Sequence, residues 1–190
     1  MSYDIKLMHL KTEEIALMKH PQYILGSNVP AKMIDGVLVP IMQTEASLSV
    51  TYNYSNYYND AAKGDARFLY DDGNYGIWGL SGKTPRESIP MLTDMISRIQ
   101  AKYQDAQGNW ILGTKIRHKY LKNGVEVPVT GYVLTHASEY MFVAEKYTIS
   151  EGDVSNYWIA TAANAIRPLS DMLVMATDNL LESDVVWCVS

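Results

Sequence analysis

The sequence contains almost no cysteine, no long apolar run and little net charge. Each of these absences excludes or disfavours a class of protein. The single cysteine, Cys188, excludes an internal disulfide and any metal site built from several thiolates. The chain has no charged-then-apolar leader and no apolar run of about 18 residues. Its net charge is only −5, which disfavours nonspecific binding to nucleic-acid phosphates. We therefore expect a cytoplasmic protein that binds neither a membrane nor nucleic acid directly.

Recognisable catalytic patterns are missing as well. The histidines are far apart and form no metal-binding spacing with cysteine or carboxylates, and no serine stands in a nucleophile elbow. The segment from Gly79 to Thr84 is similar to the end of a phosphate-binding loop, but Ile77 stands where that motif requires its first glycine. Glycines before a helix can still hold an anion, so nucleotide binding and a simple tight turn both stay open. The sequence predicts no enzyme, no metal and no cofactor.

Tyrosine and methionine are abundant, with 14 and 10 residues. Both are enriched where proteins bind other proteins. The alternative is that the tyrosines border a sheet and the methionines fill its core. The cluster of Tyr52, Tyr54, Tyr57 and Tyr58 is the best candidate surface, and core packing explains Tyr52 and Tyr54 better than the other two. We take Tyr54, Tyr57 and Tyr58 as candidate partner-binding residues.

Two groups of acidic residues complete the candidate site. Asp71 and Asp72 stand in a predicted turn, where a solvated loop is the alternative interpretation. Asp178, Glu182 and Asp184 follow a predicted helix, and acids at a helix C-terminus oppose the helix dipole. Their unfavourable position suggests that they face a basic partner.

Two long helices are predicted from apolar periodicity. Residues 153–179 carry one stripe with a spacing of three or four residues: Trp158, Ala162, Ile166, Leu169, Leu173, Ala176 and Leu180. Asp153 or Ser155 is expected to cap its start, and Pro168 to kink it. The second helix ends near residue 103. Its cap is either Thr84, in a capping box with Glu87, or Ser88.

Strands are predicted from alternation. Residues 3–10 and 46–55 alternate clearly, and the small polar side chains of the second strand suggest a face open to solvent. Residues 13–19 and 56–63 are expected to form short helices. Asp35-Gly36 and Asn123-Gly124 are hairpin turns. Residues 109–148 are rich in β-strand signals, with 130–148 forming further strand, or a strand and then a short helix. Residues 185–187 should dock on the core.

The order of these elements predicts one α+β domain over residues 1–190. A mainly antiparallel sheet has two principal helices packed on one face, and residues 104–152 form a β-rich insertion.

Three fragments carry a resemblance: residues 51–55, residues 79–90 and residues 156–165, together with Trp187 near the end. They resemble a family of small uncharacterised proteins carried by phages and prophages of Firmicutes and other gut bacteria. Shorter members run from the second helix almost directly to the Tyr-Trp helix, which implies that residues 104–152 are inserted. The Leu-Tyr-Gly-Lys-Thr sequence of the family is Leu80-Ser-Gly-Lys-Thr84 here, without the tyrosine.

Size and origin are similar to those of the type II-A anti-CRISPR inhibitors of clostridial prophages. This similarity implies a protein that occupies a host RNA-guided nuclease in the bacterial cytoplasm and blocks its engagement of DNA. Such nucleases hold nucleic acid in basic channels, where an acidic, tyrosine-rich protein can compete. The alternatives are a protein that sequesters a nucleotide signal and a phage structural or assembly factor. A homodimer is also left open.

Overall fold

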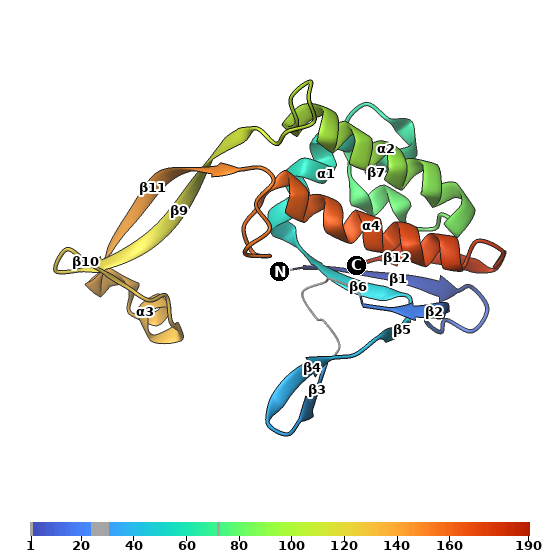
Figure 1. The fold of residues 1–190 in the computed structure, drawn as a ribbon, viewed down its shortest axis with the longest axis horizontal. Coiled ribbons are helices and arrows are strands. Elements are labelled where there is room, and N and C mark those ends of the chain that lie inside the picture. The colour runs from blue at the N-terminus through green and yellow to red at the C-terminus, as the bar shows by residue number, and fades with distance from the viewer. Residues whose placement is uncertain (1, 24–30, 72) are drawn as a thin grey trace.

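The fold is α+β, as predicted. The computed structural model describes residues 2–23, 31–71 and 73–190. A body of helices on a small antiparallel sheet carries two projections, a hairpin and a longer β-ribbon (Figure 1). No helix in these ranges is long and apolar enough to cross a membrane.

The central sheet joins the two ends of the chain. Strand β1 (Ser2–His9) lies between β6 (Ser47–Thr51) and β12 (Val185–Val189), and both pairings are antiparallel. Ile5 stands opposite Leu48 and Leu7 opposite Trp187. The predicted inward face of β1 is confirmed, because Tyr3, Ile5 and Leu7 are buried.

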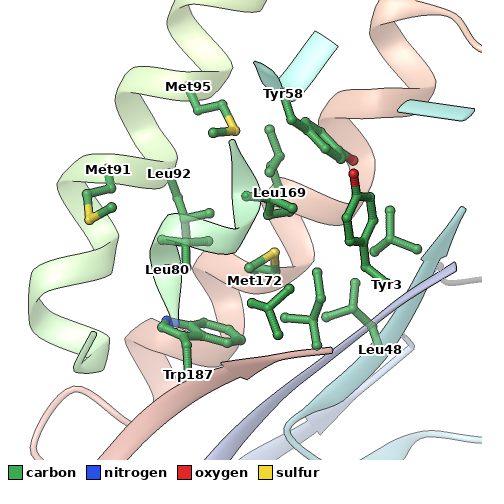
Figure 2. Packing of buried hydrophobic residues seen from close by; sticks show 14 of the residues in the cluster. Tyr3, Leu48, Tyr58, Leu80, Met91, Leu92, Met95, Leu169, Met172 and Trp187 are labelled. Atoms are coloured by element: carbon green, nitrogen blue, oxygen red, sulfur yellow. The ribbon is translucent and has the colours of Figure 1, made fainter. Parts of the chain in front are cut away.

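Two helices cover one face of this sheet, as predicted. They are α2 (Pro85–Tyr103) and α4 (Ala162–Asp178), which pack against each other. Figure 2 shows Leu92 and Met95 of α2 close to Leu169 and Met172 of α4, with Trp187 of the sheet below them. The core therefore lies between the helix pair and the sheet.

The start of α2 settles which residue caps it. The Thr84 hydroxyl accepts a hydrogen bond from the Glu87 N–H at 3.3 Å, and the Glu87 carboxylate accepts one from the Thr84 N–H at 2.8 Å. This capping box satisfies two N–H groups that the helix cannot bond itself. Pro90 lies inside the helix, so the alternative start at Ser88 is wrong.

Removing this cap should have a measurable cost. We expect Thr84→Ala to lower the free energy of unfolding by about 1 kcal/mol, because the N–H groups of the first turn lose their partner. Thr93→Ala is the matched control, since Thr93 lies on the exposed side of α2 and its hydroxyl donates to the Ile89 carbonyl of the same helix. Urea denaturation followed by circular dichroism measures both. Equal losses in the two variants would show that the cap is unimportant.

The predicted start of the last helix is wrong. Residues 153–161 are not helical, and Thr161 is the cap, accepting from the Asn164 N–H at 3.2 Å. Asp153 instead accepts two bonds from Ser155 in a local turn, at 2.8 and 2.6 Å. Trp158 belongs to no helical stripe and its side chain is 59% exposed. The Asn164 side chain holds this segment by donating to carbonyls within it, which competes with helix formation.

Two shorter predictions also need correction. Residues 13–19 form no helix, because the backbone of Ala16 hydrogen-bonds the backbone of Leu7 and Ala46. Strand β2 (Leu17–Gln22) follows and pairs with β5 (Gln43–Glu45). The strand predicted over residues 46–55 ends at Thr51. A 3₁₀ turn, η1 (Tyr52–Tyr54), follows and leads into α1 (Ser55–Ala62). The face expected to be open is partly covered, since Ser49 and Thr51 are buried.

The remaining elements are small. A hairpin of β3 (Ala31–Ile34) and β4 (Val37–Pro40) turns at Asp35-Gly36, as predicted. A 3₁₀ turn, η2 (Ala66–Phe68), precedes a second hairpin of β7 (Leu69–Asp71) and β8 (Asn74–Tyr75), which leads to the 3₁₀ turn η3 (Ile77–Leu80).

The longer projection follows α2. It contains β9 (Leu112–Lys122), β10 (Val125–Val127), α3 (Gly131–Thr135), the 3₁₀ turn η4 (Ala137–Glu139) and β11 (Met141–Ser150). The turn at Asn123-Gly124 is confirmed, with positive φ at both residues. The short helix precedes the strand, which is the reverse of the predicted order.

Candidate functional site

The most distinctive surface is the longer projection, residues 112–150, which we call the arm. Strands β9 and β11 pair over ten positions, from Leu112 opposite Ser150 to Leu121 opposite Met141. The ribbon reaches away from the body, with β10 and α3 at its tip (Figure 1). Side chains of paired residues share a face, so the register divides the arm into two faces.

One face of the arm is covered by ion pairs. The Glu145 carboxylate lies 2.7 Å from the Arg117 guanidinium and 3.1 Å from the Lys119 ammonium. Glu126 of β10 lies within 4 Å of both cations, at 3.8 and 3.9 Å. Glu145 hydrogen-bonds Arg117 and Lys119, and these bonds lower its pKa. The charges of this face are thus neutralised within the chain; near the tip the same face also carries Met141, which is 67% exposed.

The other face is apolar and uncovered. Ile116 and Phe142 are 56% and 57% exposed. His118 stacks on the Phe142 ring at 5.0 Å, and Lys146 stands directly opposite Ile116. A ribbon with large apolar side chains in solvent and no core beneath them is typical of an interaction surface. We call the side chains of Ile116, His118, Phe142 and Lys146 the apolar face of the arm.

A buried ionic cluster attaches the arm to the body. The Glu151 carboxylate, just after β11, lies 2.6 Å from the Lys115 ammonium. It also accepts hydrogen bonds from the Tyr57 hydroxyl at 2.7 Å and the Ala162 N–H at 2.8 Å. Arm, α1 and the start of α4 therefore meet at one carboxylate that is almost completely buried. We call Tyr57, Lys115 and Glu151 the root of the arm.

The shorter hairpin is a second apolar projection. Met33 and Leu38 form a cross-strand pair, as do Ile34 and Val37, and all four side chains are exposed. Since adjacent pairs point to opposite faces, both faces of the hairpin present apolar side chains. An isolated two-stranded hairpin is at best marginally stable in water, so contact with a partner would stabilise this one.

The tyrosines predicted to bind a partner lie in the core instead. Tyr54, Tyr57 and Tyr58 are buried, and their hydroxyls donate to the carbonyls of Tyr157, Ala160 and Ala165 respectively. They pack there because η1 and α1 turn them inward beneath the segment that precedes α4. The prediction that they form a surface is wrong, and the core-packing alternative holds.

The acidic residues after α4 do not face outward as a group. Asp178 lies 2.5 Å from the His20 ring, Glu182 lies 2.8 Å from the Lys19 ammonium, and Asp184 lies 3.4 Å from the His9 ring. Basic side chains of β1 and β2 offset the unfavourable position at the helix end. Asp71 is exposed in β7, whereas Asp72 lies outside the described residues.

The glycines before α2 form a tight approach to the core. A Cβ on Gly79 would lie 2.5 Å from the Phe68 backbone. Any larger residue at this position would therefore force the backbone to shift. Gly82 adopts a positive φ of 78° in the turn before Lys83. The Glu87 carboxylate of the capping box already occupies the helix N-terminus, which favours the tight turn over an anion site.

The charged groups that line a cleft between α1 and α2 are paired with each other. This cleft has a volume of about 490 Å³ and is lined by Asp60, Asp65, Arg98 and Lys102 among others. Lys102 lies 2.7 Å from Asp60 and Arg98 lies 2.8 Å from Asp65. Within the described residues, no group of three or more histidines, cysteines or acids could hold a metal ion.

The sequence predicts β-strands in the arm but does not distinguish the arm as a site. Ile116, His118 and Tyr120 alternate with polar residues, which indicates a strand. This alternation occurs both in exposed ribbons and in half-buried strands, so it does not reveal that the arm is exposed. The chain matches no protein-family model, and no curated protein or solved structure is significantly similar to it.

Proposed function

We propose that this chain acts by binding another protein through the apolar face of the arm and catalyses no reaction of its own. The observation that carries this proposal is the exposure of Ile116 and Phe142 on a ribbon whose opposite face is ion-paired. Burying such side chains against a partner is favourable, and aromatic anchors dominate interface energies. The long reach of the arm allows it to enter a groove of the partner (Figure 1).

The specific partner that we propose is a host RNA-guided DNA nuclease in the bacterial cytoplasm. The sequence resemblance to phage proteins and the net charge of −5 support this choice. The test is DNA cleavage by such a nuclease in the presence of the wild-type chain, the double variant Ile116→Ser/Phe142→Ser, and Leu69→Ser. Leu69 is an exposed leucine of β7, outside the arm, and serves as the matched control.

We expect the wild-type chain and Leu69→Ser to inhibit cleavage equally. The double arm variant should need at least about tenfold more protein for the same inhibition, because it loses two apolar anchors. Full cleavage at a large molar excess of the wild-type chain would exclude this nuclease as the partner. Equal inhibition by the arm variant would instead exclude the arm as the binding surface.

A second candidate function is assembly of a phage structure. It is favoured by the β3–β4 hairpin, which adds a second apolar projection to the arm. A chain with two such projections can contact two neighbours at once. A chain that self-associates but leaves nuclease cleavage unaffected would favour this function over an inhibitor.

A further inference from the structure

We infer that the apolar face of the arm binds the opposite end of the body of a second copy of this chain, in a head-to-tail contact. This inference rests on the proposed function of the arm as a protein-binding element and gives the arm a second occupant, with which the nuclease would compete. It follows from a second apolar surface, from the charges of the two surfaces and from their positions in the molecule.

The second surface is a cleft beside the end of β1. Its volume is about 440 Å³, and its lining includes Met8, Leu10, Val186 and Trp187, with Glu13 at its edge. Leu10 is 63% exposed, and Glu14 follows Glu13 in the same exposed turn. We call Met8, Leu10, Glu13, Glu14 and Val186 the far end. It combines three apolar side chains with two acidic ones.

The charges of arm and far end are complementary. Residues 112–150 contain five basic and three acidic side chains, which gives them a net charge of +2. Since the whole chain has a net charge of −5, the other residues together carry −7. The three acids of the arm pair with its own lysines and arginine. Lys146, which stands opposite Ile116, forms no ion pair within the described residues. Glu13 and Glu14 form none either, and they outweigh Lys11 in their turn.

The geometry favours a head-to-tail contact over two arms meeting each other. A symmetric arm-to-arm contact would bury Lys146 on both copies without an acidic partner, because the acids of the arm already pair with its own cations. The arm leaves one end of the body, whereas β1 ends and β12 begins at the other (Figure 1). A contact between two different surfaces at opposite ends leaves a free surface on each copy, so association continues into rings or open chains.

The test uses two variants that each remove one of the surfaces. The arm variant is Ile116→Ser/Phe142→Ser, and the far-end variant is Leu10→Ser/Glu13→Gln; Leu69→Ser is again the control. Molar mass is measured by light scattering against protein concentration, at low and high salt. Because all of these side chains are exposed, circular dichroism should show the same fold for every variant.

We expect the wild-type chain and Leu69→Ser to gain mass with concentration, and to gain less at high salt because ions screen the charges. Each surface variant alone should associate at least about tenfold more weakly. An equimolar mixture of the two should form a dimer and stop there, since only one intact arm and one intact far end can meet. Lys146→Glu should weaken association, and Glu13→Lys in the same chain should restore part of it.

Three results would overturn the inference. The first is a wild-type chain that stays monomeric at every concentration. The second is a variant mixture that stays monomeric while the wild type associates. The third is association that is lost in the arm variant but unchanged in the far-end variant. A monomeric wild-type chain whose arm still inhibits the nuclease would leave the proposed function standing. An arm variant that matches the wild type in both association and inhibition would exclude both.

Discussion

Raising the pH above about 10 should destabilise this protein steeply, because that is where an unfolded tyrosine loses its proton. Burial raises the pKa of Tyr54, Tyr57 and Tyr58, and the nearby Glu151 carboxylate raises that of Tyr57 further. Above the unfolded pKa, the unfolded chain therefore binds fewer protons than the folded chain. The free energy of unfolding then falls as pH rises, by up to about 1.4 kcal/mol per pH unit for each such group.

Urea denaturation at a series of alkaline pH values measures this loss, with tyrosinate absorbance recorded on the same samples. Tyr54, Tyr57 and Tyr58 are buried, so they should ionise only when the chain unfolds. Tyr58→Phe is the informative variant: it removes one buried hydroxyl, so stability should depend less steeply on pH. Ionisation of all 14 tyrosines while the chain stays folded would contradict the burial of this cluster.

The same tyrosines show which part of the fold could be predicted from sequence. Tyr54, Tyr57, Tyr58 and Ala61 are spaced as i, i+3, i+4 and i+7, which is the pattern of a buried helix face. The strand alternation from residue 46 onward predicts a strand over some of the same residues. No local signal in the sequence places the end of β6 at Thr51. Strong local signals, such as the Thr84 capping box and the Asn123-Gly124 turn, predicted the local structure correctly where no tertiary contact opposed them.

The candidate site was harder to predict, because exposure depends on what packs nearby. The sequence predicts that Asp178 faces a partner, yet His20, 158 residues earlier in the chain, hydrogen-bonds it. Ile116 and Phe142 stand in segments predicted only to be β-rich, and the ribbon that carries them projects from the body. In both cases the deciding contact, or its absence, is between segments distant in sequence.

Replacing Lys115 should have the largest effect of any single substitution at the root of the arm. Lys115→Met keeps the length of the side chain but leaves the buried Glu151 carboxylate without its cation at 2.6 Å. Breaking a buried ion pair in this way costs about 3–5 kcal/mol, because the remaining charge is desolvated and unpaired. The Tyr57 hydroxyl and Ala162 N–H still donate to Glu151, so we expect a loss of about 3 kcal/mol.

The control is Arg117→Met, which removes a cation from the exposed face of the same strand. Its partner Glu145 stays in water, where solvent screens the pair, so the loss should be much smaller than in Lys115→Met. Lys115→Met/Glu151→Gln should recover most of the stability, because the neutral amide can still accept from Tyr57 without an unpaired charge. Urea denaturation near neutral pH measures all three.

A consequence for the arm separates this cluster from an ordinary stabilising ion pair. Lys115 lies on β9 and Glu151 just after β11, so both strands enter the body beside the same carboxylate. Loss of Lys115 should therefore increase hydrogen exchange of backbone amides at the base of the arm more than in β1 or β12. The double variant should restore protection there. Uniform exchange across arm and body in Lys115→Met would show that the cluster stabilises the whole fold and does not specifically hold the arm.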